Sequence, residues 1–110
     1  MKLWVDDIRP APEGYVWCKS VKEAKAFLEL FEATKWTVLG HGGSFEHEIK
    51  VIDMDHDAGE FAHLGGDYIR LLDWLEETGR NYPIRIHSMN PVGVANMRRI
   101  IERNGWKEVK

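Results

Sequence analysis

Three short apolar runs in this chain end abruptly in polar side chains, and this pattern restricts the fold more than any other feature. A run that is apolar throughout is typical of a strand in a parallel sheet that is covered on both faces. The carboxyl ends of parallel strands lie at the same edge of their sheet. We therefore expect three polar groups to converge at one edge: Asp6-Asp7, Asp55-His56-Asp57, and His87-Ser88 with Asn90.

Strand and helix patterns alternate along most of the chain, which predicts an α/β fold with a mostly parallel sheet. Only a proline-rich segment, residues 8–14, separates the first two expected strands, so the usual crossover helix is reduced to a loop. Length and composition fit a single domain over residues 1–110. The expected strands cover residues 3–5, 15–19, 49–54 and 84–86, with an edge strand at 106–109. The expected helices cover residues 20–33, which begin with capping-box spacing, 68–79 and 91–105.

Residues 34–47 have the weakest pattern in the chain. Their composition predicts an antiparallel excursion, with a strand at residues 36–39 and a glycine-rich turn at residues 40–44. This excursion would lead into the next buried strand.

The last helix has a clear start signal. Asn90 is a good N-cap, and Pro91 suits the first helical position because its missing N–H would be unpaired there. The N–H groups of Val92 and Gly93 can then bind an anion, and the small Gly93 lets a phosphate oxygen approach closely. Alternatively, Ser88 and Asn90 serve only to cap the helix.

Asp53 lies in the middle of an expected buried strand, where an unpaired carboxylate is unfavourable. Arg85 lies at the same depth in another expected strand, two residues before its polar end. If the two strands are neighbours, these side chains form an ion pair.

Composition excludes several classes of protein. The net charge of −3 argues against an extended nucleic-acid surface. The single cysteine, Cys18, excludes an internal disulfide and a thiolate metal site, and its apolar neighbours predict a buried thiol. The five tryptophans are scattered along the chain, which favours packing over a base-stacking surface. No signal peptide or membrane-length apolar run is present, so we expect a cytoplasmic protein.

The polar strand ends resemble those of response-regulator receiver domains. On this resemblance Asp6 and Asp7 hold a divalent cation, Asp55 takes the phosphoacceptor position and Ser88 the hydroxyl position. The chain departs from that pattern because it lacks the first helix and a clear counterpart of the receiver lysine.

The cyclic-phosphate processing receiver-like domains are a closer match. The resemblance rests on four blocks in order: residues 5–12 (Val-Asp-Asp-Ile-Arg-Pro-Ala-Pro), residues 55–57 (Asp-His-Asp) before a glycine, residues 66–68 (Gly-Asp-Tyr), and residues 87–93 (His-Ser-Met-Asn-Pro-Val-Gly) with Asn96-Met97. It implies a receiver-like (flavodoxin-like) three-layer sandwich. It also implies a role in processing cyclic phosphate ends, on RNA or on a nucleotide.

Opening a cyclic phosphate by water needs a base, an acid and relief of charge at phosphorus. His56 and His87 are the candidate acid/base pair, and Asp55 and Asp57 complete the candidate catalytic group. Carboxylates in such a site repel phosphate unless a cation lies between them, and an all-oxygen ligand set favours Mg²⁺. The metal candidates are Asp6, Asp7 and Asp55, and the phosphate-binding candidates are Arg9, Ser88, Asn90 and Gly93.

Each of these assignments has a structural alternative. Arg9 can form a surface salt bridge with Asp7 or Glu13 instead of binding phosphate. His87 can be a strand-end histidine paired with a carboxylate. We therefore keep two hypotheses: a phosphoesterase acting on cyclic phosphates, and a degenerate receiver domain that serves as a non-catalytic signalling or binding module.

Overall fold

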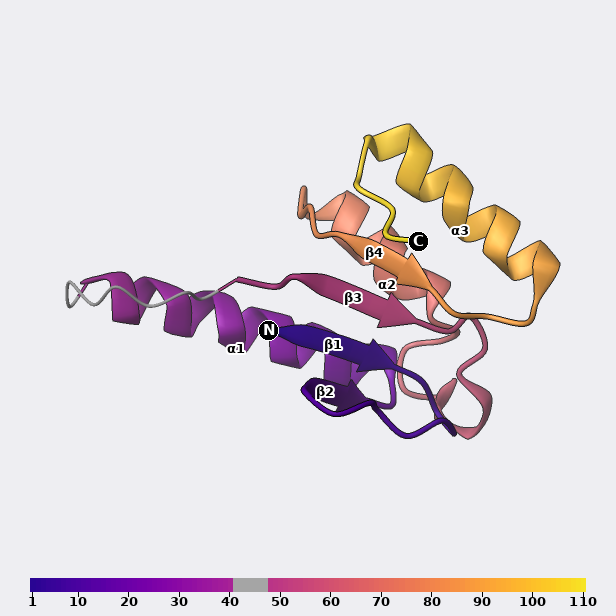
Figure 1. The fold of residues 1–110 in the computed structure, drawn as a ribbon, viewed down its shortest axis with the longest axis horizontal. Helices are drawn as coiled ribbons and strands as arrows, with labels where there is room; N and C mark the ends of the chain where they lie inside the picture. Colours follow the sequence, from indigo (N-terminus) through magenta and orange to yellow (C-terminus); the bar gives the residue numbers. More distant parts are fainter. Residues whose placement is uncertain (41–47) are drawn as a thin grey trace.

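The computed structural model describes residues 1–40 and 48–110, and these contain one four-stranded sheet with three α-helices (Figure 1). All strand pairs are parallel, and the strand order is β2-β1-β3-β4. The strands are β1 (Lys2–Val5), β2 (Tyr15–Cys18), β3 (Val51–Met54) and β4 (Ile84–Ile86). The helices are α1 (Val21–Gly40), α2 (Ile69–Glu77) and α3 (Pro91–Asn104), with a short 3₁₀ helix at Gly59–Phe61. This is the expected receiver-like α/β fold.

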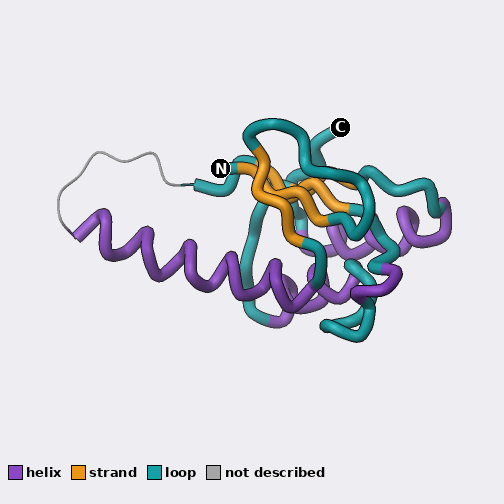
Figure 2. Tube along the Cα trace, turned by 90° about the horizontal axis from the view of Figure 1, so that it is seen from below, coloured by secondary structure: helices purple, strands orange, loops and turns teal. Residues whose placement is uncertain are grey.

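The direction of the crossovers determines where the helices lie. The chain moves from β2 to β3 and then to β4 in one direction across the sheet. Right-handed crossovers that advance in one direction place their helices on the same face. Figure 2 shows the helices on one side of the strands, so the described residues form one of the two helix layers expected for a three-layer sandwich. The connection from β1 to β2 runs the opposite way and contains no helix, so the expected reduction of the first crossover is confirmed.

The hydrophobic core lies between the sheet and these helices. Alternate strand residues, including Leu3, Ile52 and Ile84, are fully buried against the helices. Cys18 belongs to the same core, and burial raises the pKa of its thiol to about 12. The expectation of a buried thiol is therefore confirmed. No helix in the described part of the chain has the length and hydropathy needed to cross a membrane.

The helix starts agree with their sequence signals more closely than the helix ends do. The Ser20 hydroxyl accepts a hydrogen bond from the Glu23 N–H (3.0 Å), and the Asn90 side chain caps α3 through the Gly93 N–H (3.0 Å). The segment at 106–109 forms only an isolated parallel bridge, between Ile84 and Glu108.

The strand predicted at residues 36–39 is wrong, because α1 continues without interruption to Gly40. Trp36, Thr37 and Val38 favour strands locally, but no glycine or proline between Ser20 and Gly40 stops the helix. Most of the predicted turn at 40–44 lies outside the described residues.

Glu32 of α1 joins the helix to the segment that follows α2. It accepts two hydrogen bonds from Arg80 (2.8 and 3.1 Å) and one from the Tyr82 hydroxyl (2.6 Å). Burial alone would raise the pKa of Glu32, but these hydrogen bonds outweigh it and lower the pKa below 4.5. The ionised form of Glu32 therefore stabilises the folded state.

This linkage predicts an acid-dependent loss of stability. A carboxylate whose pKa is lower when folded contributes its stabilisation above the unfolded pKa and loses it as the pH falls through the folded pKa. We expect Glu32→Gln to lower the free energy of unfolding by about 1 kcal/mol at pH 7 and to have little effect well below pH 4. Urea unfolding at a series of pH values measures this, with Glu29→Gln as a control on the same helix. A constant difference between wild type and Glu32→Gln across this range would contradict the prediction.

Candidate functional site

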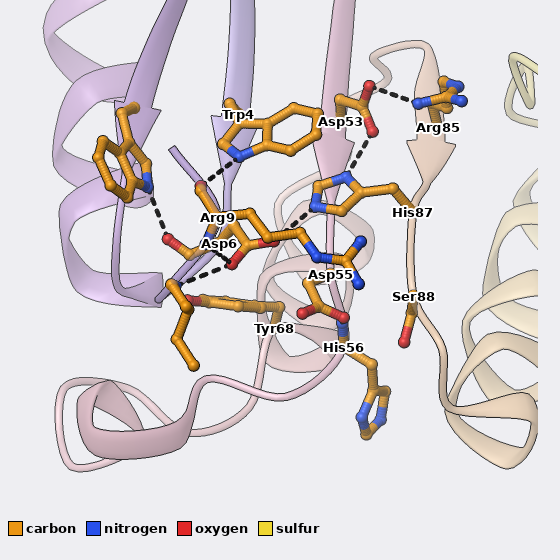
Figure 3. Close-up of polar contacts among 12 residues, drawn as sticks. Trp4, Asp6, Arg9, Asp53, Asp55, His56, Tyr68, Arg85, His87 and Ser88 are labelled. Carbon is orange, nitrogen blue, oxygen red and sulfur yellow. Dashed lines mark hydrogen bonds and ion pairs between the residues drawn. The ribbon is translucent and has the colours of Figure 1, made fainter. Parts of the chain in front are cut away.

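The three polar groups meet at the carboxyl edge of the sheet, as expected (Figure 3). Val5 pairs with Met54, and Met54 with Ile86, so β1, β3 and β4 end at the same level. Asp6, Asp55 and His87 each come directly after one of these strands. The parallel register therefore brings together residues that are up to 81 positions apart.

Asp6 is the most enclosed carboxylate of this edge, at 1% exposure. One of its oxygens accepts hydrogen bonds from the N–H groups of Ile8 and Arg9, both at 2.9 Å. The other oxygen lies 2.8 Å from Nε2 of His87. Burial alone would raise the pKa of Asp6. The two backbone hydrogen bonds and His87 outweigh this effect, so the pKa lies below its usual value. Asp6 is thus held as a carboxylate.

His87 lies between two buried carboxylates (Figure 3). Its Nε2 contacts Asp6, and its Nδ1 lies 2.6 Å from an oxygen of Asp53. A neutral imidazole donates from one nitrogen only, so both contacts become hydrogen bonds when the ring is protonated. Burial would lower the pKa of His87, but Asp53 and Asp6 raise it above its usual value. We infer that His87 is held as an imidazolium.

The predicted ion pair between Asp53 and Arg85 is confirmed, with 2.9 Å between Nη1 of Arg85 and an oxygen of Asp53. Asp53 therefore pairs with two cationic groups, one on each oxygen. The result is a continuous chain of alternating charge from Arg85 through Asp53 and His87 to Asp6.

Two tryptophans support this chain of charges, and no sequence pattern indicates their role. The ring of Trp4 stacks on His87 with 3.8 Å between centroids and an interplanar angle of 6°. Its indole N–H donates to the Arg9 carbonyl (2.8 Å), and the Trp17 indole donates to the Asp6 carbonyl (2.7 Å). Both side chains hold the loop after β1 against the sheet, so they pack as expected but also shape the site.

His56 occupies a different environment from His87. Its Nδ1 lies 2.8 Å from an oxygen of Asp57, and no described residue is within hydrogen-bonding distance of its Nε2. The ring packs against Gly93, where an added Cβ would lie 2.5 Å from Cγ of His56. The Asn90 amide points at the same pair, 3.5 Å from Nδ1 of His56 and 3.4 Å from Asp57.

This geometry corrects one expectation about Gly93. Its N–H is not free for an anion but donates to the Asn90 side chain, and the His56 ring fills the space beside its Cα. The absence of a side chain at Gly93 makes room for the His56 ring and not for the phosphate oxygen that the sequence predicts there. Ser88 accepts a hydrogen bond from the Asn90 N–H (3.1 Å), which supports the same turn.

Asp6, Asp7 and Asp55 can together offer oxygen ligands that lie within 4.8 Å of one another. Burial raises the pKa of Asp7, and the negative charges of Asp6 and Asp55 raise it further. A cation would relieve this repulsion, and an oxygen-only donor set suits Mg²⁺. The residues therefore fit a hard divalent cation.

A second group, His56, Asp57 and Asp67, also offers ligand atoms that lie within 4.8 Å of one another. The amide nitrogen of Asn90 donates toward Asp57, and Asp67 already accepts a hydrogen bond from the Ala58 N–H (3.0 Å). Like Asp6, whose oxygens face the Ile8 and Arg9 N–H groups and His87, these carboxylates already accept hydrogen bonds, and a cation at either group would replace such contacts.

Arg9 extends across the site in Figure 3 and forms no ion pair with Asp7 or Glu13, the surface partners considered from the sequence. His63, by contrast, lies in the loop before α2, where its Nδ1 contacts the Glu60 carbonyl. His41 and His47 lie outside the described residues.

Comparison with protein families identifies the chain. A family model described as the cyclic-phosphate processing receiver domain matches residues 1–103. The chain belongs to this family. Comparison with curated proteins and with solved structures gave no significant match. The residues that match this cyclic-phosphate processing receiver domain include all three strand ends of the site.

Proposed function

We propose that this domain is a phosphoesterase that opens a cyclic phosphate at the end of an RNA or on a nucleotide. The observation that carries the proposal is the contrast between the two histidines. His56 has a ring fixed by Asp57 and Gly93 and an Nε2 with no described partner, whereas both nitrogens of His87 face carboxylates. A fixed imidazole with one free nitrogen is the arrangement that proton transfer requires.

The reaction assigns a separate role to each histidine. Water attacks phosphorus and forms a new P–O bond, while the bond from phosphorus to one ribose oxygen breaks. Neutral His56 takes the proton of the attacking water at Nε2, and Asp57 stabilises the resulting imidazolium. His87 supplies a proton to the departing oxygen from Nε2, which now faces Asp6. One proton is taken up and one released, so the two residues end in exchanged protonation states.

The remaining polar groups bind and orient the substrate. Arg9 pairs with the phosphate oxygens, and Ser88 and Asn90 hold the turn at the start of α3 beside them. Asp6, Asp7 and Asp55 would hold the divalent cation, which when bound would neutralise charge on the phosphate. Asp55 is further fixed by a hydrogen bond from the His56 N–H (2.7 Å).

Hydrolysis of a nucleoside 2′,3′-cyclic phosphate, followed by chromatography with and without Mg²⁺, tests the proposal. We expect His56→Ala to reduce kcat by about 100-fold, because a positioned acid/base group contributes about that factor or more. His63→Ala is the matched control and should retain wild-type activity, since His63 lies outside the site.

Two results would reject this function. Equal activity of His56→Ala and wild type would remove His56 from the chemistry. No turnover by wild type under either metal condition would favour the non-catalytic receiver-like module, which labelling of Asp55 by acetyl phosphate would then test.

A further inference from the structure

Large apolar side chains are exposed in the loops that form the candidate site. Five such side chains are exposed in the described part of the chain, and the three most exposed all belong to loops that form this site. They are Ile8 at 78%, Met89 at 84% and Val92 at 71% exposure. The other two, Met1 and Leu30, line a shallow groove of about 200 Å³ with Phe27 and Phe31.

The sheet places these apolar groups on two sides of the polar centre. Ile8 lies in the loop after β1, and Met89 and Val92 lie in the turn between β4 and α3. β3 lies between β1 and β4, and its end carries Asp55 and His56. A ligand held at the end of β3 is therefore flanked by an apolar group on each side.

Hydrogen bonds hold the backbone beside Ile8 and Met89, so these two side chains start from defined backbone positions. The Ile8 N–H donates to Asp6 (2.9 Å). Met89 lies between Ser88 and Asn90, which are joined by the hydrogen bond from the Asn90 N–H to Ser88. These loops are held by the same hydrogen bonds that build the site.

A phosphate group alone has no use for apolar contacts, whereas a ligand with both a phosphate and a flat ring uses both kinds of surface. Charged residues adjoin Ile8 in the chain, with Asp7 before it and Arg9 after it. Three apolar side chains are few, which suits one small ring better than the roughly 800 Å² that a protein partner covers.

We propose that Ile8, Met89 and Val92 form a subsite for the nucleobase of the substrate. This inference rests on the proposed function and assigns the residues that contact the base of its substrate. Specificity for the base then arises from aliphatic contacts at the rim, and the phosphate chemistry is common to every substrate.

The test compares two substrates that differ only in the base: adenosine 2′,3′-cyclic phosphate and ribose 2,3-cyclic phosphate. We expect Met89→Ser and Ile8→Ser each to raise KM for the adenosine substrate about fivefold, because each removes an apolar contact. The KM for the ribose substrate and both kcat values should stay unchanged. Leu30→Ser, an equally apolar and exposed change on α1, is the matched control.

The outcomes separate this inference from the proposed function. Turnover of both substrates with equal KM in wild type, or equal KM changes for both in the variants, would overturn the base subsite while leaving the phosphoesterase intact. If neither substrate is turned over, the phosphoesterase is rejected, and calorimetric binding of adenosine 3′-monophosphate against ribose 3-phosphate decides the subsite. Equal affinities, or variants that bind both as wild type does, would then overturn it.

Discussion

Asp53→Ala lowers the free energy of unfolding by about 3 kcal/mol, because it leaves a buried cationic histidine without one of its partners. Asp53 is 1% exposed and contacts both His87 and Arg85. Breaking a buried ion pair from one side costs more than the pair itself contributes, since the remaining charge stays desolvated. Urea unfolding at pH 7 measures the change.

Two controls isolate the charge of Asp53 from its volume. Asp53→Asn keeps the shape and one hydrogen-bond acceptor, so its loss should be smaller than that of Asp53→Ala. Asp73→Asn removes an exposed ion pair with Arg70 and should change stability by less than about 0.5 kcal/mol. A small effect of Asp53→Ala, similar to that of Asp73→Asn, would mean that His87 is neutral or reorients freely.

Gly93→Val destabilises the protein by about 3 kcal/mol, although valine is ordinarily a better helix former than glycine. The reason is the position of the His56 ring, whose Cγ would lie 2.5 Å from an added Cβ. The surrounding turn is held by the Asn90 cap and cannot move away without losing it. Thermal and urea unfolding measure the loss, and Gly93→Ala should give a smaller loss of the same sign.

A double-mutant cycle with His56→Ala tests the stated cause. Removing the ring makes room for the added methyl groups, so Gly93→Val should cost much less in the His56→Ala background. Additive effects of the two changes would show that the cost of Gly93→Val arises from the backbone and not from the ring.

The convergence of the three strand ends was predictable because it depends only on local patterns and on the geometry of parallel strands. The ion pair between Asp53 and Arg85 was predictable for a similar reason, since a mid-strand carboxylate needs a partner at its own depth. Strand alternation also contained the signal for His87. It lies two residues after Arg85, and in an extended chain this places both side chains on the face that carries Asp53.

The failures came from residues whose environment is set by distant parts of the chain. Residues 36–39 have strand-forming side chains, but continuation of α1 outweighs that local preference. The sequence predicts that a phosphate oxygen approaches Gly93, because nothing in it indicates that the His56 ring lies there. Likewise, the scattered positions of the tryptophans predict that Trp4 packs in the fold. Its contact with His87 depends on the strand order, in which β1 and β4 lie on either side of β3.

The stack of Trp4 on His87 gives the protein an optical reporter of its own site. A cationic imidazole 3.8 Å from an indole is well placed to quench the fluorescence of that indole by accepting an electron from its excited state. Any ligand that tilts or displaces the His87 ring alters this quenching. The emission that Trp4→Phe removes is therefore the part that reports on occupancy, so ligands can be screened without labelling the protein and before any reaction is known.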